Sequence, residues 1–352
     1  MIYDDDRSDY LRSMNPWIQA ARLRTLPLAL SGILLGGTLS HICGVQHNDS
    51  QLNQPNLFWW IMVLALLTAT GLQILSNFAN DYGDFKKGTD TKANRTDRAM
   101  ASGKINENQM KKALWIVGVI TFLLGVSLIS ISGLFQSKNG IFMLLAGLVA
   151  IAAAINYTMG KRAYGYSGLG DVFVLIFFGL VPVVLGMGVL NGLFTDTASS
   201  KNLDVFLMAA LGLGFLSVAV LNVNNYRDIP TDTEQNKKTI AVRLGAKKTL
   251  FYHRILLLLG GGLIPASFLV FEKRYFEWPS MMGAQTFFLI GVFTPVFLQL
   301  SSHYQSVKNA EPGQREILNQ QLKKLSISIL VLVLIYAFLA YFVIDFLGPD
   351  KD

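Results

Sequence analysis

Nine runs of roughly 20 mostly apolar residues, each bounded by charged residues, Gly or Asn, limit what this 352-residue chain can fold into. A helix of about 20 such residues crosses the hydrocarbon core of a bilayer. The runs predict nine transmembrane helices, at 26–45, 57–79, 113–134, 140–159, 170–191, 203–224, 250–271, 283–301 and 325–347. Charged residues make up 15% of the chain, against about 25% in a soluble domain. We therefore expect an all-α, polytopic membrane protein, with one domain over residues 1–352 and its helices around a central cavity.

The distribution of Lys and Arg predicts how these helices are oriented. With nine spans, 25 of the 30 basic residues fall on the side of the N-terminus and only five on the other side. Loops on the cytoplasmic side of membrane proteins are enriched in Lys and Arg, so we expect a cytoplasmic N-terminus in a multi-pass protein of the cell (inner) membrane. The basic loops also explain the net charge of +7, and we see no nucleic-acid site.

Cysteine and histidine usage excludes some kinds of site. Cys43 is the single cysteine, so an intramolecular disulfide is impossible. The histidines, His41, His47, His253 and His303, are scattered and lack the i, i+4 spacing of helical metal sites. We therefore expect no transition metal bound by histidine, and we expect His47 and His303 to lie in loops.

A short internal repeat contains most of the acidic residues that suggest chemistry. The segment Asn80-Asp-Tyr-Gly-Asp84 is echoed by Asn224-Asn-Tyr-Arg-Asp228. Each copy follows an apolar run and is followed by Thr-Asp-Thr and a basic stretch. Because four predicted spans separate the copies, both should lie at cytoplasmic helix ends and can face one another across the bundle.

Facing carboxylates need a cation between them. Up to five would surround one cavity and would repel one another strongly: Asp81, Asp84, Asp90, Asp228 and Asp232. Mg²⁺ prefers oxygen ligands and is typically held by one or two carboxylates together with substrate phosphates. The nearby arginines suit a bound diphosphate, because a guanidinium can donate two parallel hydrogen bonds to phosphate oxygens. Such residues are also common helix caps, but recurrence of the cluster on one side favours a metal site.

These motifs resemble those of the UbiA superfamily of membrane prenyltransferases, whose members carry an Asn/Asp-rich motif after the second helix and another after the sixth. Residues 73–91 are similar to the branch that acts on 1,4-dihydroxy-2-naphthoate in menaquinone synthesis. Residues 21–27, 164–171 and 224–228, with Asp232, Lys238 and Thr239, resemble the same branch. The 4-hydroxybenzoate branch has an Asp where this chain has Gly88, which favours the naphthoate branch. Ala99 stands where that branch and its relatives often have Pro, which leaves the shape of the loop beyond Arg98 open.

The resemblance implies an enzyme that transfers a polyprenyl group from a polyprenyl diphosphate to 1,4-dihydroxy-2-naphthoate. Carbon dioxide and diphosphate would be lost, and demethylmenaquinol would form. The resemblance also implies one Mg²⁺ held by Asp81 and Asp84 and a second held by Asp228 and Asp232, which together neutralise the departing diphosphate. The reaction would take place in the lipid bilayer, with the active site toward the cytoplasm.

Further candidates surround these carboxylates. For the diphosphate they are Arg22, Arg227 and Lys238, each of which could instead serve only to orient the protein. Asn77 lies one helical turn before Asp81 and would complete the metal shell or hydrogen-bond within the bundle. Asn80 and Asn224 open the two motifs and are further substrate-binding candidates.

Two candidates concern the aromatic acceptor. Asp171 opens the fifth predicted span and would serve the acceptor or cap a helix. Tyr157, near the cytoplasmic end of the fourth, would line the site or be an interfacial aromatic. Gly32 and Gly36 form a small-xxx-small pattern that predicts helix packing.

Two alternative functions stay open. The same fold could prenylate another aromatic acceptor, such as 4-hydroxybenzoate, homogentisate or a haem vinyl group. A secondary transporter can also contain internal repeats and membrane carboxylates. Transporters usually bind near the midplane of the bilayer, whereas the carboxylates here cluster at helix ends.

Overall fold

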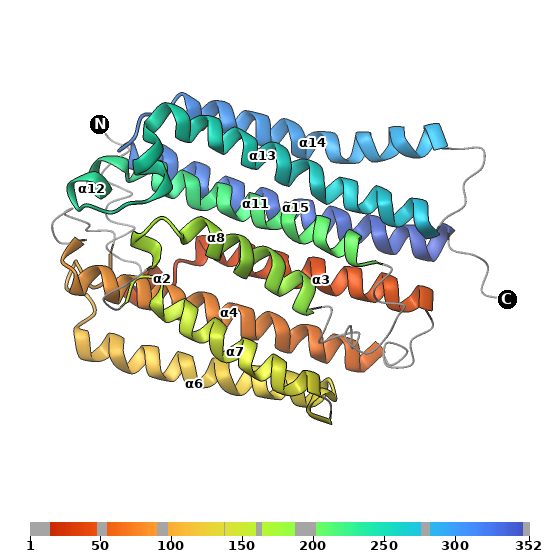
Figure 1. Cartoon of the computed structure of the whole chain (residues 1–352), viewed down its shortest axis with the longest axis horizontal. Coiled ribbons are helices and arrows are strands. Elements are labelled where there is room, and N and C mark those ends of the chain that lie inside the picture. Colours follow the sequence, from red (N-terminus) through yellow and green to blue (C-terminus); the bar gives the residue numbers. More distant parts are fainter. Residues whose placement is uncertain are drawn as a thin grey trace.

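The computed structural model describes residues 15–47, 55–89, 98–136, 138–159, 164–186, 202–275 and 282–347. Within these ranges the chain is helical and contains no strand, which confirms the expected all-α class. Figure 1 shows the long helices running side by side along one axis, with the short helices α2 and α12 near one end of the bundle. The long helical segments are α3 (Leu26–His47), α4 (Pro55–Lys86), α6 (Glu107–Ile131), α7 (Lys138–Asn156), α11 (Leu203–Arg227), α13 (Ile240–Tyr275), α14 (Met282–Lys308) and α15 (Arg315–Leu347).

Shorter helical pieces complete the fold and position polar residues. They are α2 (Pro16–Ala21), η1 (Leu23–Thr25), η2 (Leu134–Gln136), η3 (Tyr164–Tyr166), α8 (Gly170–Leu175), the π-helix η4 (Ile176–Leu185) and α12 (Ile229–Glu234). Helix α8 continues directly into η4, and together they occupy the fifth predicted span.

Each of the nine predicted spans overlaps a helical segment, and residues 187–191 of the fifth lie outside the described residues. Among the described residues, six stretches are long and apolar enough to cross a membrane, so this is a multi-pass membrane protein. They are Pro16–Cys43, Asn56–Lys86, Glu107–Ile131, Leu203–Arg227, Ile240–Arg274 and Arg315–Phe342. The total of nine spans and the cytoplasmic N-terminus stay predictions.

Several helices extend beyond the apolar runs that predicted them. Helix α14 continues to Lys308 and α15 begins at Arg315, because charged residues at these ends end the apolar run and not the helix. Helix α13 begins at Ile240 but is broken at Gly245 (φ 71°), so its long straight part starts close to the predicted position. The two acidic motifs consequently lie on helix ends, in the last turns of α4 and α11.

Helix α11 lies at the centre of the larger packing cluster and is buried along most of its length, against α13, η4 and α15. Helix α3 packs on η4 through the two glycines of its small-residue pattern. A Cβ on Gly32 would lie 2.6 Å from Cγ of Pro182, and one on Gly36 would lie 2.8 Å from its carbonyl oxygen. The predicted packing role of this pattern is confirmed.

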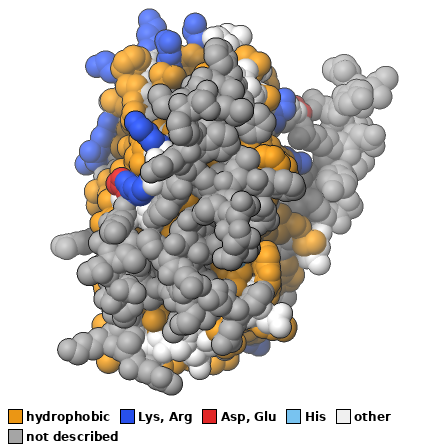
Figure 2. All heavy atoms as spheres, turned by 90° about the vertical axis from the view of Figure 1, so that its right-hand side faces the viewer, with side chains coloured by type: hydrophobic (Ala, Val, Ile, Leu, Met, Phe, Trp, Pro, Cys, Tyr) orange, Lys and Arg blue, Asp and Glu red, His pale blue; other side chains and the backbone are white. Residues whose placement is uncertain are grey.

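The surface of the bundle fits a lipid environment. Large apolar side chains are exposed along α6, α7, α13 and α15, including Trp115 and Phe338. Figure 2 views the end of the bundle opposite α12, where hydrophobic side chains dominate the described surface and Lys and Arg lie towards its margins. Exposed apolar helix faces of this kind are stable where lipid, and not water, surrounds the protein.

Candidate active site

A cavity of about 350 Å³ lies among α3, α4, α7, α8–η4 and α11, so the expected central cavity is present. Its lining includes Asn80 and Ile61, which both lie on α4 and are about 28 Å apart at 1.5 Å per residue. The cavity is therefore long and narrow. Polar side chains gather at the end near α2, and they are Arg22, Gln73, Asn77, Asn80, Tyr157 and Asn224.

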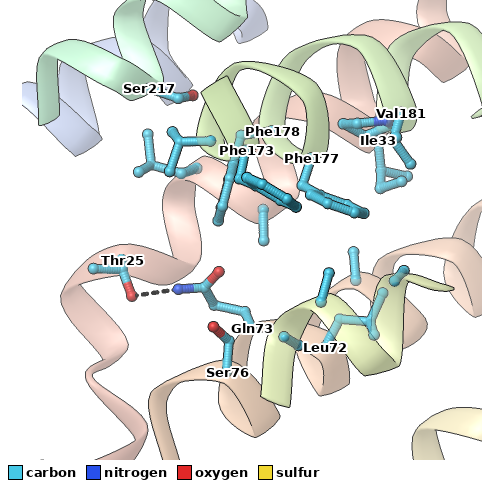
Figure 3. A pocket seen from close by; sticks show the side chains of 18 of the residues that line it. Thr25, Ile33, Leu72, Gln73, Ser76, Phe173, Phe177, Phe178, Val181 and Ser217 are labelled. Carbon is cyan, nitrogen blue, oxygen red and sulfur yellow. Dashed lines mark hydrogen bonds between the residues drawn. The ribbon is translucent and has the colours of Figure 1, made fainter. Parts of the chain in front are cut away.

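Aromatic and aliphatic side chains form the rest of the cavity wall. Figure 3 shows Phe173 and Phe177 pointing into the cavity from α8 and η4, and their rings stack with centroids 6.1 Å apart. On the opposite wall Gln73 donates a hydrogen bond to Oγ1 of Thr25 (2.9 Å), which joins α4 to η1. Beyond these residues the lining is almost entirely apolar, ending near Ile61 and Leu185.

The first acidic motif joins this cavity through Asn80. With its amide oxygen facing the guanidinium, Asn80 accepts hydrogen bonds from Arg22 (2.7 and 3.2 Å) and donates one to Asp84 (3.0 Å). Asn80 and Asp84 are one turn apart on α4 and so share a helix face. Arg22 reaches this position because the chain takes a left-handed conformation there (φ 51°), between α2 and η1. Tyr166 from η3 also donates a hydrogen bond to Asp84.

Asp81 differs from Asp84 in having little hydrogen bonding. Its carboxylate is 1% exposed, and neither oxygen accepts a hydrogen bond of normal geometry from the described residues. The guanidinium groups of Arg98 and Arg22 place positive charge near this carboxylate. A buried carboxylate that lacks well-formed hydrogen bonds is a marker of a functional site, because leaving it so is costly.

The second acidic motif is neutralised by its own arginine. Arg227 is 2% exposed, and it donates to Asp228 through Nε (2.8 Å) and Nη2 (2.5 Å). The same guanidinium donates to the side-chain oxygens of Asn224 (2.8 Å) and of Asn319 on α15 (2.5 Å). Asn224 lines the cavity, so this motif also reaches the cavity through its leading asparagine.

Lys237 connects the two motifs. Its Nζ lies 3.8 Å from Oδ1 of Asp84 and 3.5 Å from Oδ1 of Asp232, so these two oxygens are no farther apart than the sum of the distances. Gln235 strengthens the connection by donating to the carbonyl oxygen of Thr89, which follows the first motif (2.7 Å). The motifs thus meet at one end of the bundle, as the repeat predicted.

The electrostatics around Asp232 favour a bound cation. The pKa of Asp232 is raised to about 6, chiefly by burial and also by the nearby Asp228, while Lys237 opposes the shift. The pKa of Lys87 is lowered by burial and by repulsion from Lys237, and the nearby Asp84 only partly opposes this shift. Among the described residues no group of three or more His, Cys, Asp or Glu side chains is close enough to hold a metal, and Asp90 lies outside them.

Several predicted site residues are engaged within the bundle. Asn77 lines the cavity, but its amide donates to the carbonyl oxygen of Ala21 (2.8 Å) and to Thr25 (3.3 Å). Lys238 is exposed, and its backbone N–H bonds the carbonyl oxygen of Tyr166. Tyr157 lines the polar end of the cavity, as predicted for a site residue.

Asp171 lies away from the cavity lining. It is buried in the first turn of α8 and accepts a hydrogen bond from Tyr252 on α13 (2.9 Å). The prediction that it could cap this helix is wrong, because Leu169 holds the N-cap position. Asp171 thus joins α8 to α13.

Three residues of the site went unrecognised in the sequence: Lys237, Tyr166 and Asn319. Lys237 belongs to the basic stretch after the second motif and is adjacent to Lys238, so residue type alone could not separate them. Tyr166 lies in the segment 164–171, which resembles the family, and this resemblance could have marked it as a site residue. No pattern in the sequence marks Asn319, which is the only one of the three on α15.

The expectation that the histidines are scattered and partly in loops is also wrong. His253 on α13 and His303 on α14 lie with their Nε2 atoms 3.1 Å apart, and Nδ1 of His303 is 3.1 Å from the amide oxygen of Gln321. His303 is buried because α14 continues past the apolar run, and His47 is the last residue of α3.

The comparison with known proteins identifies the family. The UbiA prenyltransferase family model matches residues 51–319, which is most of the chain and includes both acidic motifs. The chain belongs to the UbiA prenyltransferase family. It is therefore a transferase, and members of this family generally depend on a divalent metal.

Curated relatives share much of the chain. A 1,4-dihydroxy-2-naphthoate octaprenyltransferase of Haemophilus influenzae is 42% identical over 243 residues, covering 68% of this chain and 73% of the relative. An Escherichia coli protein of the same name is 39% identical over 251 residues, covering 69% and 72%.

A solved structure supports the fold independently. It is described as "Structural and mechanistic insights into the biosynthesis of Digeranylgeranylglyceryl phosphate synthase in membranes", and it matches with a TM-score of 0.54 at 17% identity. The match covers 92% of this chain and 97% of that chain. At this identity the similarity concerns the fold alone.

Proposed function

We propose that this protein transfers a polyprenyl group from a polyprenyl diphosphate to 1,4-dihydroxy-2-naphthoate, with loss of carbon dioxide and diphosphate. The observation that supports this most is the meeting of two acidic motifs at the polar end of a long apolar cavity. The names of relatives with 42% and 39% identity support the acceptor. The product would be demethylmenaquinol.

The residues present fit a divalent cation, which we propose is Mg²⁺. Asp81 supplies a buried carboxylate without well-formed hydrogen bonds, and Asp84 and Asp232 already share one positive charge. Carboxylate oxygens are the ligands that Mg²⁺ prefers. Asp81 and Asp84 would hold one ion and Asp228 and Asp232 a second. When bound, the metal supplies positive charge that stabilises the leaving diphosphate.

The residues of the chain bind and orient the two substrates. Arg22 is placed by Asn80 at the polar end of the cavity, where its guanidinium suits phosphate oxygens. The apolar length of the cavity would take up the polyprenyl tail, with Phe173 and Phe177 along its wall. Aromatic faces also stabilise a nearby positive charge, such as the one that develops on the allylic carbon.

The chemical step is a substitution at that allylic carbon. The carbon–oxygen bond to diphosphate breaks with its electron pair leaving on the diphosphate. A ring carbon of the naphthoate forms the new carbon–carbon bond, and its carboxylate departs as carbon dioxide, leaving the electron pair in the ring. The low water content of an apolar cavity would protect the allylic cation from hydrolysis.

Purified protein with Mg²⁺, a polyprenyl diphosphate and an acceptor tests this function. We expect a prenylated naphthoquinol by mass spectrometry and stoichiometric diphosphate release with 1,4-dihydroxy-2-naphthoate, and little product with 4-hydroxybenzoate. Preference for 4-hydroxybenzoate would refute the acceptor, and transport of substrate without turnover would refute the enzyme.

Single substitutions test the two motifs. Asp84→Asn and Asp228→Asn should each abolish turnover in folded protein. Asp204→Asn, the same chemical change in an exposed residue at the other end of α11, is the matched control and should retain activity. Full activity in either motif variant would contradict the assignment.

A further inference from the structure

The acidic motifs present an electrostatic problem when no metal is bound. Asp84 and Asp232 are 4% and 6% exposed, and they approach one another at the end of the bundle. Two such carboxylates in a poorly solvated site would be unfavourable unless a positive charge lay between them. The chain itself supplies that charge through Lys237.

The environment of Lys237 is built to hold an ammonium group at this position. The Nζ atom lies 4.7 Å from the centroid of the Tyr166 ring, and the hydroxyl of the same tyrosine binds Asp84. The backbone N–H of Lys237 bonds the carbonyl oxygen of Asp232 (2.9 Å), after a turn made by Asn236 at φ 55°. The charge is therefore positioned by backbone, ring and carboxylates together.

The ion pairs of Lys237 are nevertheless loose. At 3.5 and 3.8 Å they are longer than the roughly 2.7–2.9 Å of a strong charge-assisted hydrogen bond. Arg227 contrasts with it, because its guanidinium makes four contacts of 2.5–2.8 Å with Asp228, Asn224 and Asn319. Lysine also has a flexible stem and a single point charge, whereas a guanidinium is held by a rigid fork of donors.

We propose that Lys237 is a built-in counter-ion that occupies the position between the two motifs until a divalent cation arrives, and that the cation displaces it. The proposal rests on the proposed function, from which it takes the metal. A divalent cation that bound Asp84 or Asp232 would draw their oxygens to about 2.0–2.1 Å for Mg²⁺, which leaves no room for the ammonium between them. The displaced Lys237 stays within reach of the site and adds a positive charge beside the incoming diphosphate.

Competition between Lys237 and the metal should be visible in the metal affinity of the protein. Removing a basic residue from the site should tighten metal binding, because the metal no longer competes with an internal cation. For an interaction of about 1 kcal/mol the dissociation constant of the metal would fall about fivefold. A lysine that served only the diphosphate would leave metal affinity unchanged while no phosphate is present.

The experiment measures binding of Mn²⁺ to the full chain in detergent, without substrates, by electron paramagnetic resonance of the free ion. Lys237→Gln is the main variant, and Lys237→Met keeps the apolar stem over Tyr166 if the amide is poorly tolerated. Lys247→Gln removes the same charge from an exposed position on α13 and controls for net charge. Thermal unfolding in EDTA reports on folding and on the metal-free state.

We expect Lys237→Gln or Lys237→Met to bind Mn²⁺ at least about fivefold more tightly than the wild type, and Lys247→Gln to stay within about twofold of it. Both Lys237 variants should have a lower Tm than the wild type in EDTA. Addition of Mn²⁺ should raise their Tm by more than it raises that of the wild type. Unchanged or weaker Mn²⁺ binding in the folded variants would overturn the role proposed for Lys237, and it would not contradict the proposed enzymatic function. A wild type that binds no Mn²⁺ would instead refute the metal site of the proposed function.

Discussion

Replacing Arg227 by methionine should destabilise the protein strongly when metal is absent. The side chain is 2% exposed and pairs with Asp228, which is 7% exposed. Methionine fills much of the same volume, so the main loss is the positive charge and its hydrogen bonds. Removing one partner of a buried ion pair costs about 3–5 kcal/mol, because the other charge is left buried.

A second ion pair in the same chain supplies the control. Arg274 pairs with Asp204 through both nitrogens (2.9 and 2.6 Å), but the side chains are 31% and 51% exposed. Exposed pairs contribute about 0–1 kcal/mol, so Arg274→Met should have little effect. The two substitutions change the same residue types and differ mainly in burial.

Thermal unfolding in detergent with EDTA measures the difference. At about 2 °C per kcal/mol, Arg227→Met should lower Tm by on the order of 6–10 °C and Arg274→Met by at most about 2 °C. The double variant Arg227→Met/Asp228→Asn removes the remaining charge and should recover a large part of the loss. Equal effects of the two single variants, or a double variant less stable than Arg227→Met, would refute the reasoning.

Three other predictions concern packing, tail length and pH. Gly32→Val should lower Tm by several degrees because its Cβ would collide with Pro182, whereas Gly147→Ala, which faces open space, should be tolerated. Ala69→Phe should shorten the longest polyprenyl chain accepted, read by product mass, because residue 69 lines the cavity. Mn²⁺ affinity should fall as pH is lowered below about 6, by up to tenfold per unit, because burial raises the pKa of Asp232 to about 6 and the proton then competes with the metal.

The sequence was sufficient to predict the helices and the meeting of the motifs. Apolar runs of membrane-spanning length depend on composition alone, so they can be recognised without knowledge of how the helices pack. The repeat at Asn80 and Asn224 placed both motifs at equivalent helix ends, and Lys237 now shows that these ends lie together. The helix ends themselves were predicted less well, because helices continue past the apolar run where charged side chains can reach water.

Residue roles near the motifs could not be read from residue type. Lys237 and Lys238 are neighbours of identical chemistry, and the turn at Asn236 decides which one points between the carboxylates. The pair formed by His253 and His303 is invisible in the sequence, because 50 residues and a helix–helix packing arrangement separate the two rings. Spacing rules for histidine apply within one helix and do not cover contacts between helices.

The two copies of the repeat place their first and last residues in the same way. In each copy the leading asparagine lines the cavity and the closing aspartate lies one helical turn farther along. They differ at the second position, where the first copy has Asp81 and the second has Asn225, and at the fourth, where the first has Gly83 and the second has Arg227. A Cβ on Gly83 would lie 2.7–2.8 Å from atoms of Thr158, so α4 could not pack against the end of α7 with a larger residue there.

That steric difference explains how each copy is neutralised. Because Gly83 has no side chain, the first copy takes its cations from elsewhere in the chain, with Arg22 bound to Asn80 and Lys237 beside Asp84. The second copy includes its own cation, because α11 and α15 leave room for Arg227 between Asp228 and Asn319. Asp84, the closing aspartate of the copy without an internal arginine, pairs with Lys237 at 3.8 Å, so a divalent cation can enter there without breaking an ion pair as tight as that of Arg227 and Asp228.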